Sequence, residues 1–247
     1  SSVYRYGDIK EGLLNIGFSD IRGYNFSASD TQENQSTVNR DSVANVFATK
    51  KIFIEDQVYT IVAIVIRGTV GEEWYGNFNI GTGTEHYSFR NSYTDVMMRL
   101  NQYMSEREIP KDQTKLLITG HSRGAATANL LAADLDGSEK YAAAENIYAY
   151  TFATPNVTTQ PGVHDNRYHN IFNILNDADL VTYVPPYDWG FDKYGLTLSF
   201  PKKGSAAYQQ DISLVAGYFQ TYTKVAFEEQ DPAGVRLMTW LLTIGAK

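Results

Sequence analysis

The sequence contains no cysteine among its 247 residues. This absence excludes disulfide bonds, thiolate metal sites and a cysteine nucleophile, and it leaves the redox compartment undecided. The sequence also has neither a pair of histidines at metal-ligand spacing nor a glycine-rich loop of the kind that cradles phosphates. It therefore predicts no metal ion and no organic cofactor.

Positive charge and long apolar runs are scarce as well. The 21 lysines and arginines are outnumbered by 28 aspartates and glutamates, which gives a net charge of −7. This balance argues against binding to nucleic acid or to an anionic membrane, because phosphates would be repelled. The longest strongly apolar run extends only from Tyr59 to Ile66, far short of the roughly 20 residues that span a bilayer. We expect a soluble protein without a transmembrane segment.

No linker, internal repeat or low-complexity tract divides the chain. Because 247 residues suit one α/β domain, we expect a single domain over residues 1–247. The chain starts at Ser1 with neither a methionine nor a hydrophobic leader, and a cleaved signal peptide or a trimmed chain would both give this start. Secretion is therefore one expectation for its localisation, and the oligomeric state stays open.

Apolar patterns predict strands and helices that alternate through the middle of the chain. Strands are predicted at residues 43–54 and 57–67, in "KLLIT", in "ENIYAYTFAT" and in "NIFNILND", and helices over residues 91–107, from Arg123 onward, and from Pro232 to Gly245. A polar turn is predicted at residues 55–57. This order favours an α/β fold with a mostly parallel sheet and helices on both faces. Ligands of such sheets bind at the carboxyl ends of the strands, where the site is expected.

The segment "KLLITGHSRGAATANLL", residues 115–131, places Ser122 between Gly120 and Gly124, after a buried strand and before an alanine-rich helix. A sharp strand–turn–helix of this kind holds a nucleophilic serine in a strained conformation, and the glycines leave room for the close approach of strand and helix. The amino terminus of the helix also favours a negative charge forming beside it. The alternative is a serine that only caps the helix.

Several further motifs, taken in order, resemble the class 3 lipases, which are α/β-hydrolases that cleave esters of acylglycerols and related lipids. The motifs are "VIRGT" ending at Thr69, then Trp74, "HYSF" from His86, "ITGHSRGAA", "TFATPNV" and "NDADLVTYVPP". The resemblance covers most of residues 43–200. It implies an α/β-hydrolase-like fold and hydrolysis of a lipid or small ester through an acyl-enzyme.

Matched residue by residue, the resemblance implies that Ser122 is the nucleophile and Asp179 the triad acid. It implies an oxyanion hole formed by Thr69 and by the backbone N–H of Arg123, whose side chain is incidental to that role. His86 matches a histidine of the family that is not the base, and we expect it to be structural.

Asp177 is the rival of Asp179 as the acid. Both residues follow the predicted strand "NIFNIL", and a carboxylate at the end of that strand can orient an imidazole. Residues two apart in a strand share a face, so spacing alone does not exclude Asp177. The resemblance favours Asp179. For either residue, the simpler interpretation is a turn aspartate that bonds to its own backbone.

No histidine in the sequence occupies the place of the catalytic base. The four histidines are His86, His121, His164 and His169. All precede Asp179, whereas α/β-hydrolases have the order serine, acid, histidine. His121 adjoins Ser122, but neighbours on a sharp turn point apart. His169 begins the strand that ends near Asp179 and so is expected roughly 30 Å away, at the other end of the sheet.

We expect the missing base beyond Lys247, with the single domain cut short at its C-terminus, or among residues missing within the C-terminal half. We therefore interpret the chain as a serine ester hydrolase. One alternative is a non-catalytic α/β-hydrolase-like binding protein that has lost its base. Another is an acyltransferase or a thioesterase on the same site.

The interval between Thr69 and the "HYSF" motif is short for a lid over the site. It reads "VGEEWYGNFNIGTGTE", residues 70–85, with few strongly apolar residues and a predicted turn at residues 81–84. A lid needs an amphipathic helix of several turns. We expect little or no lid and a site open to soluble or short-chain esters, the alternative being that residues 201–230 cover the site.

Overall fold

The structure is a computed structural model, and it describes residues 5–26, 43–68, 80–176, 179–200, 204–206, 209–210 and 213. Two residues of the predicted site, Thr69 and Asp177, lie outside the described residues. The same is true of the interval 70–79, of most of residues 201–230 and of the helix predicted from Pro232 to Gly245.

The two apolar runs predicted as strands form an antiparallel hairpin. β2 (Asn45–Ile54) and β3 (Gln57–Ile66) pair along their whole length, and Glu55 and Asp56 connect them. Both connecting residues have positive φ, at 48° and 64°. Two-residue turns of this handedness match the right-handed twist of paired strands. The predicted polar turn is thus confirmed.

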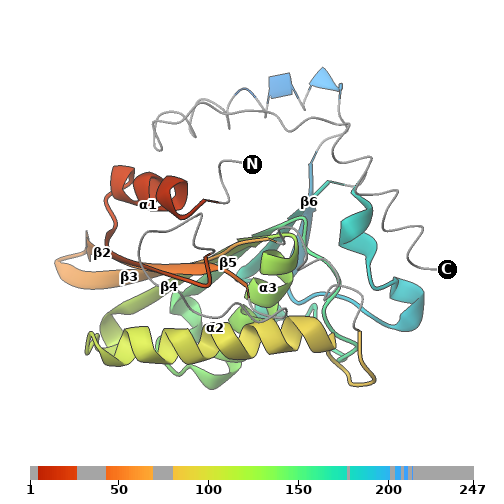
Figure 1. The fold of residues 1–247 in the computed structure, drawn as a ribbon, viewed down its shortest axis with the longest axis horizontal. Helices are drawn as coiled ribbons and strands as arrows, with labels where there is room; N and C mark the ends of the chain where they lie inside the picture. The colour runs from red at the N-terminus through yellow and green to blue at the C-terminus, as the bar shows by residue number, and fades with distance from the viewer. Residues whose placement is uncertain are drawn as a thin grey trace.

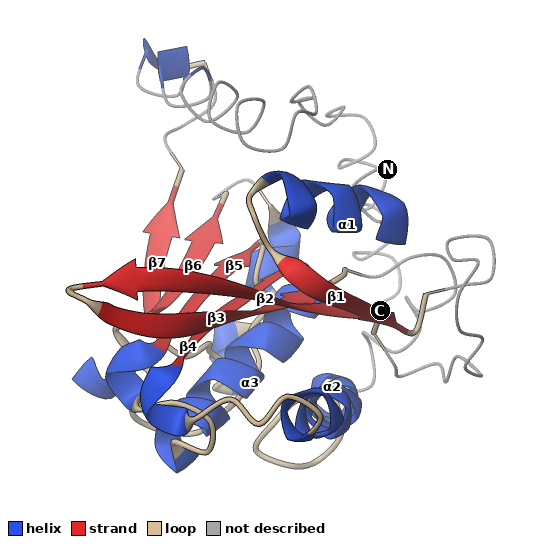
Figure 2. Cartoon of the chain, turned by 90° about the vertical axis from the view of Figure 1, so that its left-hand side faces the viewer, coloured by secondary structure: helices blue, strands red, loops and turns tan. Residues whose placement is uncertain are grey.

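The part of the chain that the structure describes contains seven strands, which form one sheet in the order of the chain (Figure 2). β1 pairs antiparallel with β2, and all strands after β3 run parallel to it. Their bounds are Ser19–Tyr24 for β1, Thr114–His121 for β4, Ile147–Phe152 for β5, Ile171–Leu175 for β6 and Leu196–Ser199 for β7. The predicted mostly parallel sheet is confirmed. Because β4, β5 and β6 run parallel, their carboxyl ends meet at one edge of the sheet.

Helices cover both faces of this sheet (Figure 1). α1 (Tyr6–Asn15) packs on one face of the sheet, against β1 and β2, through an apolar cluster that includes Leu13 and Val46. α2 (Tyr87–Ser105) and α3 (Arg123–Ser138) contact each other on the opposite face. The expectation of helices on both faces is therefore confirmed.

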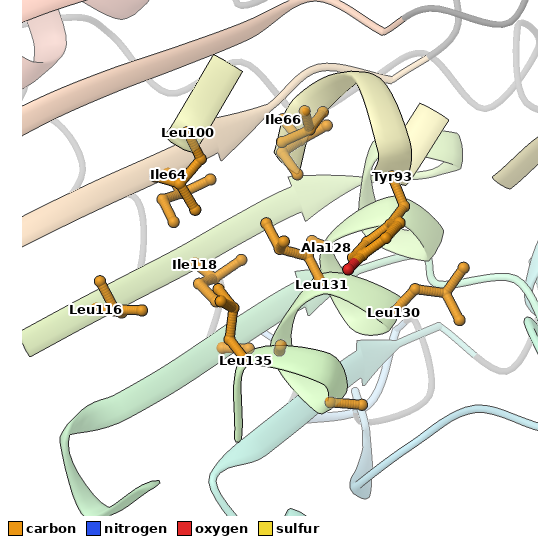
Figure 3. Packing of buried hydrophobic residues seen from close by; sticks show 14 of the residues in the cluster. Ile64, Ile66, Tyr93, Leu100, Leu116, Ile118, Ala128, Leu130, Leu131 and Leu135 are labelled. Carbon is orange, nitrogen blue, oxygen red and sulfur yellow. The ribbon is translucent and has the colours of Figure 1, made fainter. Parts of the chain in front are cut away.

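The larger core fills the space between the sheet and the pair α2 and α3 (Figure 3). In β4, every second residue from Thr114 to Gly120 is buried, because alternate side chains of a strand face one layer of the fold. The side chains that meet in this core include Ile64, Ile66, Leu100, Leu116, Ile118, Leu131 and Leu135.

The helix predicted over residues 91–107 is observed as α2, which begins earlier, at Tyr87. Four residues at helical spacing in this segment are all buried, namely Val96, Leu100, Tyr103 and Met104. Packing in the core thus accounts for these methionine and tyrosine side chains.

Three elements were not predicted, namely α1, β1 and β7. The two strands are short and expose much of their surface, so their sequences lack the apolar runs that mark β3 and β4. Short 3₁₀ helices at Lys111–Gln113, Ala144–Asn146, Asn166–Tyr168, Leu180–Tyr183 and Tyr187–Trp189 complete the connections.

Candidate active site

Ser122 is the single residue between the end of β4 and the start of α3. Its backbone has φ 54° and ψ −126°, a region that residues with a side chain rarely adopt and that costs about 1–3 kcal/mol. The Ser122 N–H donates to the carbonyl of Phe152 at 2.9 Å, and the Ser122 carbonyl accepts from Ala126 N at 3.0 Å. The strained serine is thus held from one side by β5 and from the other by the first turn of α3.

The glycines on either side of Ser122 permit a crossing of backbones. A Cβ on Gly120 would lie 2.3 Å from the carbonyl oxygen of Gly124. A Cβ on Gly124 would lie 2.4 Å from the carbonyl oxygens of both Ile66 and Arg67, at the end of β3. No side chain fits at such distances. The expectation that glycine is required here for close approach is confirmed.

Arg123 begins α3, so its N–H belongs to the first turn of the helix, at the positive end of the helix dipole. Its side chain is fully buried, and Nη2 donates to Ser92 Oγ at 3.1 Å and to Ser88 Oγ at 3.3 Å. No role was predicted for this side chain. The structure shows that it ties the start of α3 to α2. The signal in the sequence was the spacing of the two serines, which places them on one face of a helix.

Asp179 follows β6 and caps the 3₁₀ helix Leu180–Tyr183. Its Oδ1 accepts a hydrogen bond from Val181 N at 3.0 Å. This is the bond to the local backbone that a simple turn aspartate would make. It leaves further lone pairs on the carboxylate available. Burial raises the pKa of Asp179, while the bond from Val181 and the nearby His121 lower it.

His121 is the last residue of β4 and interacts electrostatically with Asp179. Burial lowers the pKa of His121, and the negative charge of Asp179 opposes that shift. The ends of β4 and β6 are therefore close enough for the charge of Asp179 to affect the pKa of His121, the residue before Ser122. The sequence alone does not reveal this coupling, because the two residues are far apart along the chain.

The other histidines lie in different settings. His86 is fully buried directly before α2, and its ring stacks on Phe89 with centroids 3.8 Å apart. His169 precedes β6 whereas Asp179 follows it, so the two lie towards opposite ends of that strand, as expected.

His164 binds two acceptors at once. Its Nδ1 lies 2.9 Å from the carbonyl oxygen of Gly195, and its Nε2 lies 2.8 Å from Asp192 Oδ2. Both ring nitrogens donate only in the protonated imidazole, so this geometry favours the charged form. The Gly195 carbonyl, followed by the Asp192 carboxylate, raises the pKa of His164 against the effect of burial.

Arg67 and Gly68 are the last described residues before Thr69. Arg67 is buried, and its N–H donates to the carbonyl of Ala44 at 2.8 Å. The chain is therefore fixed at Arg67, against Gly124, two residues before the threonine expected in the oxyanion hole.

Among the residues that the structure describes, no group of three or more metal-binding side chains was found. Nor is any helix in this part of the chain long and apolar enough to cross a membrane.

Comparisons with known proteins identify relatives of the chain. A sequence model of the family "Lipase (class 3)" matches residues 51–189, which is more than half of the chain. A curated protein from Rhizomucor miehei named "Lipase" is 30% identical over 134 residues, which covers 49% of this chain and 35% of that protein. The chain thus spans about a third of the length of this relative.

Solved structures show the same fold at lower identity. The Rhizomucor miehei triacylglyceride lipase is 20% identical with a TM-score of 0.51, and the match covers 76% of this chain and 68% of that one. A triacylglycerol lipase described as having a serine protease triad as its catalytic centre is 21% identical with a TM-score of 0.52, with coverage again of 76% and 68%. The expected α/β-hydrolase fold is confirmed.

Replacing Gly124 tests the backbone crossing beside Ser122. Because a Cβ there would lie 2.4 Å from two carbonyl oxygens, we expect Gly124→Ala to lower the free energy of unfolding by about 2–3 kcal/mol. Gly12→Ala is the control, since a Cβ at this position of α1 meets nothing within 4 Å and should stabilise by about 0.5–1 kcal/mol. Urea unfolding measures both. Equal stability of the two variants would show that the crossing is not tight.

His164 should make stability depend on pH. Because its pKa in the folded protein is raised from the usual 6.5, its contribution is fully present below about pH 6.5 and is lost as pH rises through the raised pKa. We expect His164→Gln to remove this dependence. The loss at pH 5.5 should be under about 1 kcal/mol, because the side chain is 57% exposed. Urea unfolding at pH 5.5 and 8.5 decides, and identical pH dependence in both proteins would contradict the assignment.

Proposed function

The chain belongs to the class 3 lipase family, and on this premise we propose that it is a carboxylic ester hydrolase with Ser122 as its nucleophile. The observation that carries the proposal is the conformation of Ser122. A serine held at φ 54° between a strand and a helix, with glycines at both crossing points, is the arrangement that exposes a nucleophilic hydroxyl. A serine that only caps a helix needs no such strain.

In the proposed reaction, Ser122 Oγ attacks the carbonyl carbon of the ester and its proton passes to a base. The negative charge that develops on the carbonyl oxygen is bound by the N–H of Arg123, at the positive end of α3, and by Thr69. Collapse releases the alcohol and leaves an acyl-enzyme, which water hydrolyses to the carboxylic acid. These steps need neither a metal ion nor an organic cofactor.

Two features support the residues proposed for the oxyanion hole. The end of β3 is fixed against Gly124 by the crossing of backbones, which brings the chain preceding Thr69 beside the start of α3. The buried Arg123 side chain, bonded to Ser88 and Ser92, keeps the backbone of that first turn in place. Preorganised donors lower the barrier because they need no reorganisation when charge develops.

Asp179 is proposed as the acid that orients the base. It follows β6 and is close enough to interact electrostatically with His121, the neighbour of Ser122. Its bond from Val181 fixes the carboxylate while leaving acceptor capacity for an imidazole N–H. The base itself is expected to be a histidine placed after Asp179 in the order of the fold, and none of the four histidines of this sequence has that place.

The proposed substrates are carboxylic esters of lipids or short-chain esters. The relatives of the chain include a lipase and triacylglycerol lipases. The short interval 70–85 favours esters that reach an open site.

A non-catalytic binding protein of the same fold is the second candidate. The observation that favours it is the absence of a histidine after Asp179 in these 247 residues. A fluorophosphonate probe separates the two candidates, because it reacts only with an activated serine.

Ser122→Ala should abolish hydrolysis of short p-nitrophenyl esters. We expect kcat/KM to fall about 10³-fold or more, because the nucleophile of the acyl-enzyme is removed. Ser105→Ala, at an exposed serine that bonds the carbonyl of Gln102, should leave the rate unchanged. A Ser122→Ala protein that keeps most of its activity would rule Ser122 out. If the full-length protein neither hydrolyses esters nor reacts with the probe, the binding protein is favoured.

Asp179→Asn should lower kcat about 10³- to 10⁴-fold, because an amide orients the wrong form of the base. The amide oxygen can still accept the bond from Val181, so the fold should persist. Asp177→Asn is the matched control and should change kcat by less than about tenfold. Steady-state kinetics on both variants decide, and a larger loss of kcat in Asp177→Asn would show that Asp177 is the acid.

Burial raises the pKa of Asp179 above the usual aspartate value of 3.8. On acidification, the unmutated protein should therefore lose activity at a pH higher than that value, which the pH profile of kcat measures.

A further inference from the structure

Lys193 is a fully buried lysine that precedes Tyr194 in the segment leading into β7. Its Nζ donates to the backbone carbonyl of Thr182 at 2.8 Å and to the hydroxyl of Tyr187 at 3.1 Å. The ammonium also lies 5.4 Å from the centroid of the Tyr187 ring. Lysine is almost never fully buried unless it is paired, so its place here requires an explanation.

The carbonyl that Lys193 binds belongs to the turn that carries Asp179. Thr182 donates twice to the carbonyl of Asp179, through Oγ1 at 2.7 Å and through its N–H at 3.2 Å. The N–H of Val181 donates to the Asp179 carboxylate. A single turn of 3₁₀ helix therefore links the carboxylate, through its own backbone, to the ammonium of Lys193.

Stability alone does not account for a charge at this position. Removing an ammonium from water costs several kcal/mol, and an apolar side chain of similar length would fill the space without that cost. The chain beside Lys193 is also fixed independently. The side chain of Asn129 on α3 bonds to the N–H of Tyr194 at 3.0 Å and to its carbonyl at 2.8 Å. The ammonium adds a hydrogen bond to the carbonyl of Thr182, which fixes the turn that carries Asp179.

We propose that Lys193 is a positioning residue, which fixes the turn Asp179–Tyr183 through Thr182 and so holds the Asp179 carboxylate in the orientation that the proposed triad requires. The inference rests on the proposed function. In this role Lys193 acts through its bond to the backbone of Thr182 and not on the ester itself. Catalytic groups need such support because a displacement of about 1 Å can lower a rate about 100-fold.

The charge of Lys193 is sensitive to pH. Burial lowers its pKa to about 8, and the neighbouring carboxylate of Asp192 opposes that shift. The other titratable groups around it are Tyr187, with Tyr183 against its ring, and His164, which pairs with Asp192. A hydrogen bond from a charged donor is roughly twice as strong as one from a neutral donor. The hold on Thr182 should therefore weaken as pH rises through about 8.

Lys193→Met tests the inference, because methionine fills similar space without a charge or a donor. We expect kcat for a soluble ester to fall about 10- to 100-fold, while KM changes by less than about twofold because substrate contacts are intact. Lys140→Met, at an exposed lysine bonded to Asn101, should leave both constants unchanged.

Tyr187→Phe is the second control. It removes the other acceptor of the ammonium but leaves the bond to Thr182, so kcat should fall less than about threefold. A loss equal to that of Lys193→Met would show that the lysine acts through Tyr187, and it would overturn the inference.

The pH profile separates positioning from packing. In the parent and in His164→Gln, kcat should fall about three- to tenfold between pH 7 and 10, and Lys193→Met should lack this decline. A loss of folding stability caused by the titration of Lys193 does not explain such a decline. Because its pKa in the folded protein lies below the usual 10.5, the unfolded chain binds more protons between about pH 8 and 10.5, and this group makes stability rise there. If Lys193→Met does not fold, a flat profile in the parent and in His164→Gln overturns the inference.

Hydrogen exchange of the Val181 and Thr182 amides gives a readout that needs no ester hydrolysis. After correction for intrinsic rates, we expect exchange to be about tenfold faster in Lys193→Met than in Lys140→Met. Faster exchange together with lower kcat supports the inference. Unchanged exchange, or faster exchange with unchanged kcat, overturns it while the proposed function stands. If the full-length protein hydrolyses no ester, the proposed function fails, and exchange alone decides whether Lys193 fixes the turn.

Discussion

The fold depends at one point on the contact between the first turn of α3 and the end of β3. The backbone of Gly124 lies so close to the carbonyls of Ile66 and Arg67 that a Cβ would stand 2.4 Å from both. This crossing forces the chain to turn from strand to helix through the single residue Ser122, at positive φ. The strain of Ser122 is sustained because β5 and the first turn of α3 hold its N–H and carbonyl.

Buried polar side chains connect this crossing to the other half of the site. Asn129, two turns along α3 from Ser122, bonds to Asn173 of β6 at 2.9 Å and to both backbone groups of Tyr194. Asn173 in turn bonds to the carbonyl of Tyr194 at 2.8 Å. Buried polar groups that are mutually satisfied specify one arrangement of the elements that carry them. The helix that follows Ser122 and the strand that precedes Asp179 are therefore held in a fixed relation.

The sequence was sufficient where structure follows from local pattern. The apolar runs of β3 and β4 and the glycines around Ser122 predicted the hairpin, the parallel sheet and the strand–turn–helix. Prediction failed for α1, β1 and β7, whose short and partly exposed segments carry weak patterns. It also could not foresee contacts between distant segments, such as that of Lys193 with Thr182 or of His121 with Asp179. Those contacts depend on how the elements pack.

Burial of Asp179 has two opposed consequences for the chemistry proposed at this site. A carboxylate removed from water interacts more strongly with an imidazolium than a solvated one does, because the effective dielectric constant is lower. The same burial raises its pKa and so favours the neutral acid, which cannot stabilise a positive charge. The N–H of Val181 offsets that effect by donating to the carboxylate. This donor is available only while the 3₁₀ turn is formed, so fixing the turn preserves both the orientation of the acid and its charge.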